Sequence, residues 1–335
     1  MNHRLLHPTA WVKWSDWPKW LGVCALALLM APAFAQPKGV LVFEGKDGWV
    51  FPGWENLQQH NAPAMREGVA LIREAERLFH HAKIQLVVVV IPTKGVLHAS
   101  HLPDSVSVSP EVKNRYADIQ AEFKRVGVVS VDLYPAFAKL HSQGKQTYYK
   151  TDYHWTAFGS EAAAAAVADT VSQLNVIPPN PNAAPVPLGE WVHERHFGDL
   201  VSKFMSPVRR DELGRERFTV RLPPPASSGL LDEDSPAIHV MGNSFVQPYW
   251  GFSQAISAQL KVPSSLTWNA GSVGQWAIAV MHAEAQLKGL TKPKVIVWQM
   301  NEAQVQIGPD VGGMWDIKGL MSPDAWKQRL AEALK

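Results

Sequence analysis

An aspartate and a histidine stand two residues apart in the stretch TDYHWTAFGSEAAAAAV, directly ahead of an alanine-rich run that predicts a helix. A serine hydroxyl is a poor nucleophile unless a base removes its proton, and histidine is the usual base. The imidazole in turn needs an acceptor on its second ring nitrogen, which fixes its tautomer. Asp152 and His154 supply both groups in one short loop. The pair therefore predicts nucleophilic catalysis by a serine from elsewhere in the chain.

Ser244 is the best-placed candidate for that serine. It follows the strand-like segment PAIHVMG, and Gly242 permits a tight turn between this strand and the helix that we expect next. A serine in this position lies at a helix N-terminus, where backbone N–H groups can hold a developing oxyanion. The arrangement is similar to a nucleophile elbow, although it lacks the G-x-S-x-G spelling. We expect Asp152, His154 and Ser244 to form a catalytic triad.

Each of these motifs also has a simpler structural explanation. A serine ahead of a helix is most often an N-cap, because its hydroxyl accepts a hydrogen bond from an otherwise unpaired backbone N–H. Thr156 could cap the helix that follows it in the same way, which would leave Asp152 and His154 as exposed loop residues. The motifs favour catalysis only when they are taken together.

Strand-like and helix-like segments alternate through most of the chain. The run from Leu86 to Ile91 is entirely apolar and mostly β-branched, which is typical of a strand buried on both faces of a parallel sheet. VGVVSVDL and PKVIVWQM are expected to be buried strands too, and further strands are expected in PAIHVMG and SSLTW. Helices are expected over residues 63–82, 110–126, 158–174, 248–260 and 275–288 and near the C-terminus. The alternation predicts a three-layer α/β sandwich with a mainly parallel sheet.

Polar side chains follow several of the expected strands, and ligands of parallel sheets gather beyond the carboxyl ends of the strands. The backbone N–H of Ser244 is a candidate for an oxyanion hole. Further candidates lie in NAGSVGQW, and they are Asn269, Gly271 and Gly274. The candidates for substrate contacts are Lys94, Gln275 and Asn301.

The first 35 residues have the order of a secretory signal. Basic residues precede the apolar run LGVCALALLM, and APAFAQ then supplies an A-x-A cleavage site. We expect cleavage after Ala35 and export, with a retained membrane anchor as the alternative. Residues 36–335 would then form one domain with an irregular insertion around residues 177–235.

Composition excludes several classes of site. The chain holds 32 basic and 30 acidic residues, and residues 1–35 contain three of the former and one of the latter, so the remainder is neutral and predicts no nucleic-acid partner. Its single cysteine, Cys24, lies in the signal segment, which excludes disulfides and thiolate chemistry from the mature chain. His193 and His196 have a spacing that suits a metal, but no third ligand is near in sequence. We expect no metal and no cofactor.

Five motifs together resemble the periplasmic alginate O-acetyltransferase proteins of the AlgJ/AlgX type. They are GKDGWVF, VVVIPTKGVLHASHLP, TDYHWTAFGSEAAA, GDL at 198–200 and GNSF at 242–245, and they occur in the family's order between about residues 39 and 305. The resemblance implies an SGNH-hydrolase-like fold with the Asp-His pair before the serine, and it implies Asp152, His154 and Ser244 as the triad. GNSF replaces a GTSY-like form, so Asn243 could alter the oxyanion environment. Because the chain ends soon after NEAQ, we expect it to lack the C-terminal carbohydrate-binding module of AlgX-type members.

The resemblance also implies a function, a location and partners. An exopolysaccharide, alginate or another, would receive acetyl groups on its hydroxyls in the periplasm through an acetyl-serine intermediate. A membrane-bound O-acyltransferase-type partner would deliver the acetyl group, within a polysaccharide synthesis and export complex. Aromatic side chains could stack on the sugar rings, and the candidates are Trp155, Trp250, Trp276 and Trp298, of which the last lies in an expected buried strand. Two alternatives stay open: an acetylesterase with the same triad, and a non-catalytic polysaccharide-binding subunit.

Overall fold

The computed structural model describes residues 41–178, 185–222, 236–270, 273–287, 292–312 and 318–335. The expected signal segment, residues 1–35, and the oxyanion candidate Gly271 fall outside these ranges. No helix within the described ranges is long and apolar enough to cross a membrane.

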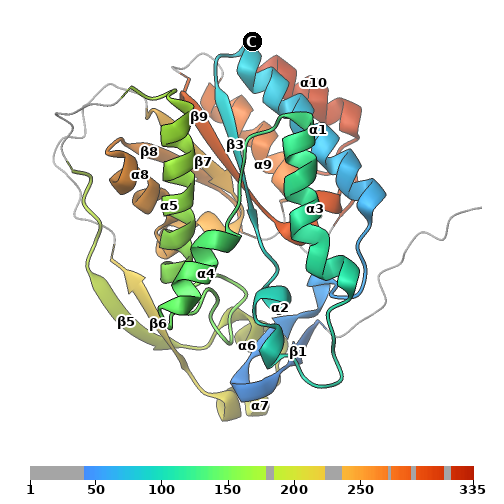
Figure 1. Cartoon of the computed structure of the whole chain (residues 1–335), viewed down its shortest axis with the longest axis vertical. Helices are drawn as coiled ribbons and strands as arrows, with labels where there is room; N and C mark the ends of the chain where they lie inside the picture. Colours follow the sequence, from blue (N-terminus) through green and yellow to red (C-terminus); the bar gives the residue numbers. More distant parts are fainter. Residues whose placement is uncertain (1–40, 179–184, 223–235, 271–272, 288–291, 313–317) are drawn as a thin grey trace, which may run out of the picture. The chain divides into compact units, whose positions relative to one another are not determined.

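A five-stranded parallel sheet forms the centre of the fold, with the strand order β4-β3-β9-β7-β8 (Figure 1). The strands are β3 (Gln85–Ile91), β4 (Ser130–Val131), β7 (Ile238–Gly242), β8 (Ser264–Trp268) and β9 (Val295–Asn301). β3 and β9 pair along their full length, and every residue of β9 is buried. The residues of β3 from Leu86 to Ile91 are buried as well, as their unbroken apolar run predicts. The prediction of a mainly parallel sheet is confirmed.

Helices cover both faces of the sheet and give the expected three layers. Along β3, Val87 and Val89 face one core while Leu86 and Val88 face the other, because successive side chains of a strand point to opposite sides. The helices over the first core are α4 (Tyr134–Ser142), α5 (Ala157–Leu174) and α8 (Phe252–Leu260). Those over the second are α1 (Ala62–His81), α3 (Pro110–Val126), α9 (Gln275–His282) and α10 (Pro323–Ala333). In Figure 1, α5 and α8 lie to the left of the sheet and α1, α3 and α10 to its right.

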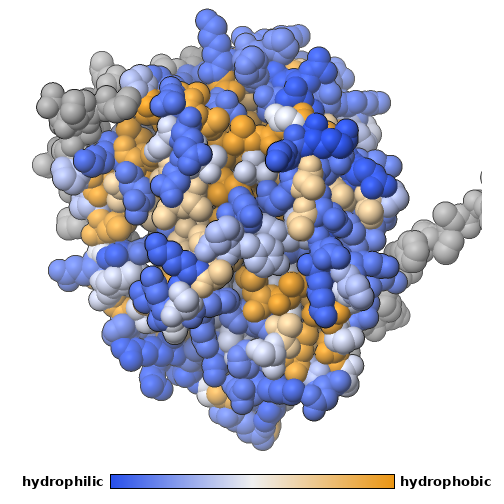
Figure 2. Space-filling model, in the orientation of Figure 1, coloured by the Kyte–Doolittle hydropathy of each residue, from blue (hydrophilic) through white to orange (hydrophobic). Residues whose placement is uncertain are grey.

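The remaining elements of these layers are short. β1 (Val42–Glu44) and β2 (Val50–Pro52) form a hairpin, α2 (Lys94–Leu97) follows β3, and η7 (Glu302–Gln306) follows β9. The other single turns are η1 (Lys46–Gly48), η2 (Gly53–Glu55), η3 (Ala99–His101) and the π-helical turn η6 (Ala283–Leu287), which continues α9. Figure 2 shows hydrophilic side chains over most of the face seen in Figure 1, with apolar patches between them, one in the region of α5.

A buried ion pair ties the carboxyl ends of β3 and β9 to α3. Arg115 Nε lies 2.7 Å from Glu302 Oε1, and both side chains are 1% exposed. The second carboxylate oxygen of Glu302 accepts a hydrogen bond from Thr93 N at 2.8 Å. The loops that follow the two central strands are therefore held to each other beneath the edge of the sheet at which ligands are expected.

The expectation of an irregular insertion around residues 177–235 is wrong for the part that the structure describes. β5 (Trp191–His196) pairs in antiparallel fashion with β6 (Glu216–Arg221), and α6 (Asp199–Phe204) and α7 (Pro207–Leu213) lie between them. No residue of β5 is buried, and only Phe218 and Val220 of β6 are. β5 lacks the apolar alternation by which strands are recognised, because it buries no side chain. In β6 the alternation is limited to Phe218 and Val220, which suggested only a short hairpin.

The expected helix over residues 248–260 is also shorter than predicted. Two 3₁₀ turns, η4 (Ser244–Val246) and η5 (Pro248–Trp250), precede α8, which begins at Phe252. Gly251 between them has a left-handed backbone, with φ of 74°, which separates the turns from the helix. Ser244 therefore does not lie at the N-terminus of an α-helix; it begins the first of two 3₁₀ turns.

Two buried histidines stack on each other beside β7. The rings of His239 and His282 lie 3.6 Å apart with an angle of 14° between them. Each Nε2 is buried without a hydrogen-bond partner among the described residues. Burial, and then the charge of His282, lower the pKa of His239, and burial lowers the pKa of His282 to about 4. Both imidazoles are therefore neutral in the folded protein at neutral pH.

Because both histidines are buried as neutral imidazoles, we predict that the free energy of unfolding decreases in mild acid. A histidine whose folded pKa lies below 6.5 takes up a proton more readily when the chain unfolds, so the stability present above that pH is lost as the pH falls toward 4. For His282 alone, the loss between about pH 7.5 and about pH 5 is roughly 2 kcal/mol. Urea unfolding at both pH values should show this loss in the wild type and a smaller one in His282→Gln. An equal pH dependence in the two proteins would contradict the prediction.

Candidate active site

The loop between α4 and α5 carries Asp152 and His154. It is closed at its base by a hydrogen bond from Thr156 N to Thr147 O at 2.7 Å. Thr156 caps α5, because its side chain accepts a hydrogen bond from Gly159 N at 3.0 Å. A capping role for Thr156 is what the simpler, non-catalytic explanation of the motif predicts. That explanation also predicts that Asp152 and His154 are exposed. Asp152 and His154 are instead only 5% and 7% exposed.

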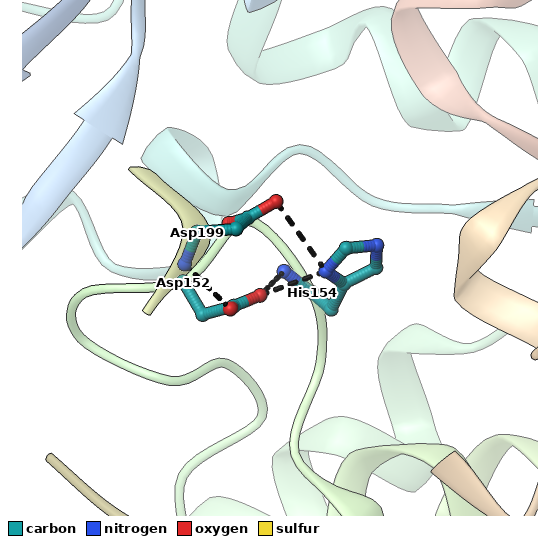
Figure 3. A group of neighbouring side chains, drawn as sticks. All are labelled: Asp152, His154 and Asp199. Carbon is teal, nitrogen blue, oxygen red and sulfur yellow. Dashed lines mark hydrogen bonds and ion pairs between the residues drawn. The ribbon is translucent and has the colours of Figure 1, made fainter. Parts of the chain in front are cut away.

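The carboxylate of Asp152 fixes the imidazole of His154 (Figure 3). Asp152 Oδ1 lies 2.7 Å from His154 Nδ1 and also accepts a hydrogen bond from the backbone N–H of His154 at 2.8 Å. The other oxygen, Oδ2, accepts one from the backbone N–H of Asp199 at 2.8 Å. Because Nδ1 faces a carboxylate, it carries the ring hydrogen, and Nε2 is left as the acceptor.

The second ring nitrogen meets the serine. His154 Nε2 lies 2.8 Å from Ser244 Oγ, across 90 residues of sequence. Asp152, His154 and Ser244 thus form a continuous chain of hydrogen bonds in which the imidazole can accept the hydroxyl proton. The structure brings together the three residues that the sequence motifs single out. That they catalyse a reaction stays a prediction.

Two side chains from other elements hold the loop in place. Lys94 is fully buried, and its ammonium group donates hydrogen bonds to three backbone carbonyls, those of Val50, Lys150 and Asp152, at 2.7, 3.0 and 2.8 Å. Burial lowers the pKa of Lys94 to about 8. On β6, the carboxylate of Glu216 accepts from the backbone N–H of Lys150 at 2.8 Å. The expectation that Lys94 contacts substrate is therefore wrong, because its charge is needed to bind the carbonyl groups of the loop.

Two tryptophans hold the serine turn. The indole N–H of Trp155 donates to Phe245 O at 3.0 Å, and that of Trp250 donates to Ser244 O at 3.0 Å. Trp250 also stacks on the His154 ring, with 5.1 Å between centroids and an angle of 27°. The two side chains are 0% and 3% exposed. Trp155 is therefore an internal support, and the expectation that it is a sugar platform is wrong. Trp250 supports the same turn but also lines the cleft beside His154, so its role as a sugar platform stays a prediction.

The other tryptophan and glutamine candidates lie in the second core. Trp276 is 4% exposed and packs edge-on against Trp298, which is fully buried as expected. Gln275 is 4% exposed and donates through Nε2 to Gln304 O at 2.9 Å. Because these side chains face the interior, the structure does not support a substrate contact for Trp276 or Gln275.

An amide network underlies the serine turn. Asn243 donates its backbone N–H to Gln299 Oε1 at 3.0 Å and its side-chain Nδ2 to Asn301 Oδ1 at 2.9 Å. Its own Oδ1 accepts from Phe245 N at 3.0 Å, and Asn301 Nδ2 donates to the Tyr153 hydroxyl at 2.8 Å. Asn301 is 6% exposed. Asn301 thus links the serine turn to the loop with Asp152 and His154. The sequence analysis instead expected Asn301 to contact substrate.

The candidates for an oxyanion hole differ in whether their backbone N–H groups are free to bind an oxyanion. The backbone N–H of Ser244 donates to no atom of the described residues, so it is available to an oxyanion. Asn269 instead donates its backbone N–H to Gly242 O at 3.3 Å, and Gly274 precedes α9 as its N-cap. Gly242 itself must be a glycine, because a Cβ there would lie 2.4 Å from Gln299 Oε1.

A cleft of about 260 Å³ opens beside the imidazole. It is lined by Asp152, His154, His196, Phe197, Asp199, Ser202, Lys203, Gln247, Tyr249 and Trp250. Tyr249 lies within hydrogen-bond distance of both His196 Nε2, at 3.1 Å, and Glu194 Oε2, at 2.8 Å. These residues come mostly from β5, α6 and η5, and the sequence analysis assigned a site role only to Asp152, His154 and Trp250. The GDL motif, which contains Asp199, was the one signal that pointed to this segment.

The surroundings shift the pKa values of the two carboxylates, Asp152 and Asp199, in opposite directions. Burial opposes the charged forms of Asp152 and His154, but their mutual charge and hydrogen bond outweigh it, so the pKa of Asp152 lies well below its usual range and the pKa of His154 is raised. Asp199 behaves differently, because burial and then the charge of Asp152 raise the pKa of Asp199. At neutral pH the negative charge next to the imidazole is therefore held most firmly on Asp152.

Asp152, His154 and Asp199 are also the one convergent group of metal-ligating side chains among the described residues, with ligand atoms within 4.8 Å of one another. However, Nδ1 of His154 is bonded to Asp152 and Nε2 to Ser244. A metal ion would have to displace one of these hydrogen bonds. The expectation of no metal stays a prediction.

Known proteins resemble this chain over most of its length. A probable alginate O-acetylase AlgJ of Pseudomonas aeruginosa is 25% identical over 290 residues, which is 82% of this chain and 72% of that protein. The solved O-acetyltransferase domain of Pseudomonas putida AlgJ is 22% identical with a TM-score of 0.67, and the match covers 87% of this chain and 99% of that one. The solved structure of Pseudomonas aeruginosa AlgX is 17% identical with a TM-score of 0.58, over 88% and 66% of the two chains. At such identities the structural likeness establishes the fold.

The family assignment rests on a match to a whole domain. The sequence model of the family described as "SGNH hydrolase-like domain, acetyltransferase AlgX" matches residues 42–302. The match includes the central sheet, the loop with Asp152 and His154, and the turn with Ser244. It agrees with the parallel sheet between two helical layers. The chain therefore belongs to the family of AlgX-type SGNH hydrolase-like acetyltransferase domains.

Proposed function

We propose that this chain is an O-acetyltransferase that moves acetyl groups onto hydroxyls of an exopolysaccharide through an acetyl-serine intermediate. The observation that carries the proposal is the 2.8 Å contact between His154 Nε2 and Ser244 Oγ, with the opposite ring nitrogen bonded to Asp152. Membership in the acetyltransferase family, and the similarity to proteins named alginate O-acetylases, support acetyl as the transferred group.

In the first half-reaction, Ser244 Oγ attacks the carbonyl carbon of the acetyl donor while His154 Nε2 takes the hydroxyl proton. Asp152 stabilises the imidazolium that forms. The backbone N–H of Ser244 faces the developing oxyanion. When the tetrahedral intermediate collapses, the bond to the donor's leaving oxygen breaks, and that oxygen receives the proton from His154. The product is acetyl-Ser244.

In the second half-reaction, a sugar hydroxyl attacks the acetyl-serine, and His154 accepts the proton of that hydroxyl. Collapse of the second intermediate breaks the ester bond to Ser244, whose oxygen regains the proton from the imidazolium. Water in the same place would give acetate, so transfer requires that a bound acceptor excludes water from the cleft. An acetylesterase with the same triad differs only in this step.

The relatives also suggest a setting. Proteins named AlgJ and AlgX are described as alginate O-acetylases and alginate biosynthesis proteins. We propose that this chain acts in the periplasm on alginate or another exopolysaccharide, within a synthesis and export complex. A membrane-bound O-acyltransferase-type partner would supply the acetyl group.

Removal of the serine hydroxyl should abolish the reaction. Ser244→Ala should lower acetyl transfer from a model acetyl ester by a factor of at least about a thousand, because no covalent intermediate can form. Mass spectrometry of the wild type after a brief exposure to the ester should find one acetyl group on the peptide that contains Ser244. Ser172→Ala, which changes an exposed serine of α5, is the matched control and should keep full activity. Unchanged transfer by purified Ser244→Ala would contradict Ser244 as the nucleophile. Polymer acetylation that stays intact in cells carrying Ser244→Ala would support a non-catalytic, polysaccharide-binding role.

The rate should have an acid limb set by His154. Only the neutral imidazole can accept the serine proton. Burial lowers the pKa of His154, but the charge and hydrogen bond of Asp152, followed by the charge of Asp199, raise it above the ordinary value of 6.5. The rate should therefore fall as the pH decreases through a midpoint above 6.5. A pH profile of kcat/KM for the model ester measures this midpoint, and a midpoint below that of free histidine would contradict the assignment.

Acceptor dependence separates transfer from hydrolysis. Purified protein should release acetate slowly from a model acetyl ester and should form acetylated product when a polysaccharide fragment is added. Product analysis by mass spectrometry gives the ratio of acetylated oligosaccharide to free acetate. If free acetate is the sole product with acetylatable uronate and neutral oligosaccharides alike, the chain is an esterase.

A further inference from the structure

Asp199 joins α6 to the catalytic loop through three contacts. Its backbone N–H donates to Asp152 Oδ2 at 2.8 Å, and its Oδ1 accepts from Tyr153 N at 2.7 Å. Gly198 allows this close approach, because a Cβ there would lie 2.3 Å from the backbone of Thr151. The third contact uses the remaining oxygen. Asp199 Oδ2 lies 3.8 Å from His154 Nδ1.

A second carboxylate therefore faces the same ring nitrogen that Asp152 binds (Figure 3). Asp199 is partly exposed, with 21% of its side chain accessible, and Lys203 one helical turn later lies with Nζ 3.5 Å from Asp199 Oδ2. The lysine side chain is 62% exposed. The imidazole thus has two carboxylates on its Nδ1 side. The outer one, Asp199, is partly neutralised by the solvent-exposed ammonium group of Lys203.

We infer that Asp199 is a positioning residue that stabilises the imidazolium form of His154, and that Lys203 moderates this effect. The inference rests on the proposed function, in which His154 carries a positive charge in both half-reactions. Asp199 does not touch the reacting atoms in this scheme. It acts through the charge that it places beside Nδ1, and through the backbone N–H with which it orients Asp152.

Further titratable groups lie near the imidazole on the elements packed around the loop. Lys94 of α2 binds the carbonyl of Asp152, and Glu216 of β6 binds the backbone of the preceding residues of the loop. His196 of β5 lines the cleft. The turns η4 and η5 present only uncharged groups, Ser244 and Trp250. Because none of these is altered by a substitution in α6, a change in the titration of His154 can be assigned to Asp199 and Lys203.

The decisive pair of variants is Asp199→Asn and Lys203→Gln. Asparagine keeps an oxygen that can accept from Tyr153 N, while an uncharged amide nitrogen replaces the carboxylate oxygen on the His154 side. The titration midpoint of His154, followed by NMR of the labelled imidazole and assigned by its absence in His154→Gln, should move to lower pH in Asp199→Asn. It should move to higher pH in Lys203→Gln. The acid limb of kcat/KM should follow in the same two directions, and kcat of Asp199→Asn should fall about tenfold at pH values above the limb.

α10 offers a matched control. Asp324 in its first turn pairs with Lys327 at 2.8 Å, as Asp199 does with Lys203, but α10 covers the second core. Asp324→Asn and Lys327→Gln change the net charge equally and should leave both the His154 titration and the rate unchanged.

Opposite shifts in the two α6 variants support the inference. An unchanged His154 titration in Asp199→Asn, or shifts of both variants in one direction, would overturn it and leave Asp199 a purely structural link to Tyr153. The NMR measurement does not need enzymatic turnover. If Ser244→Ala proves the proposed reaction wrong, the titrations still decide whether Asp199 controls the imidazole, so the two failures are distinguishable.

Discussion

The carboxylate of Asp152 is the constraint on which the site depends. Both of its oxygens are occupied, one by the ring and backbone of His154 and the other by the backbone of Asp199. A buried carboxylate is unfavourable unless such partners surround it, and Lys94 adds a cation that binds the same loop. The orientation of the imidazole toward Ser244 is thus imposed by three separate parts of the fold, which are the loop itself, α6 and α2. No single helix or strand carries the site.

The layers of the fold could be predicted because burial leaves a strong mark on sequence. A central strand such as β3 is covered on both faces, so its apolar run is unbroken and its position could be predicted within a residue or two. The two-stranded antiparallel sheet of β5 and β6 was harder to predict from sequence. Its strands are held by backbone hydrogen bonds and bury few side chains, so β5 resembles a polar loop and only Phe218 and Val220 of β6 alternate as in a strand. The interruption at Gly251 escaped prediction for a similar reason, since a single left-handed residue divides an otherwise helical pattern.

The same distinction applies to the site. Asp152, His154 and Ser244 could be found because their residue types and local spacing are tied to their chemistry. The roles of the supporting residues depend on distant partners that no local pattern reveals. Lys94 and Trp155 were expected at the ligand, yet Lys94 binds the carbonyl of Asp152 and Trp155 binds that of Phe245, next to Ser244. A polar or aromatic residue next to a catalytic motif is therefore as readily an internal support as a ligand contact.

The two-stranded sheet of β5 and β6 also bears on how the cleft can vary. It supplies part of the cleft but contributes only Phe218 and Val220 as buried side chains. Its exposed positions can accept new residues with little effect on folding, since few packing contacts are lost. The lining of the cleft can therefore change in this peripheral two-stranded sheet while the loop with Asp152 and His154 and the turn with Ser244 stay as they are.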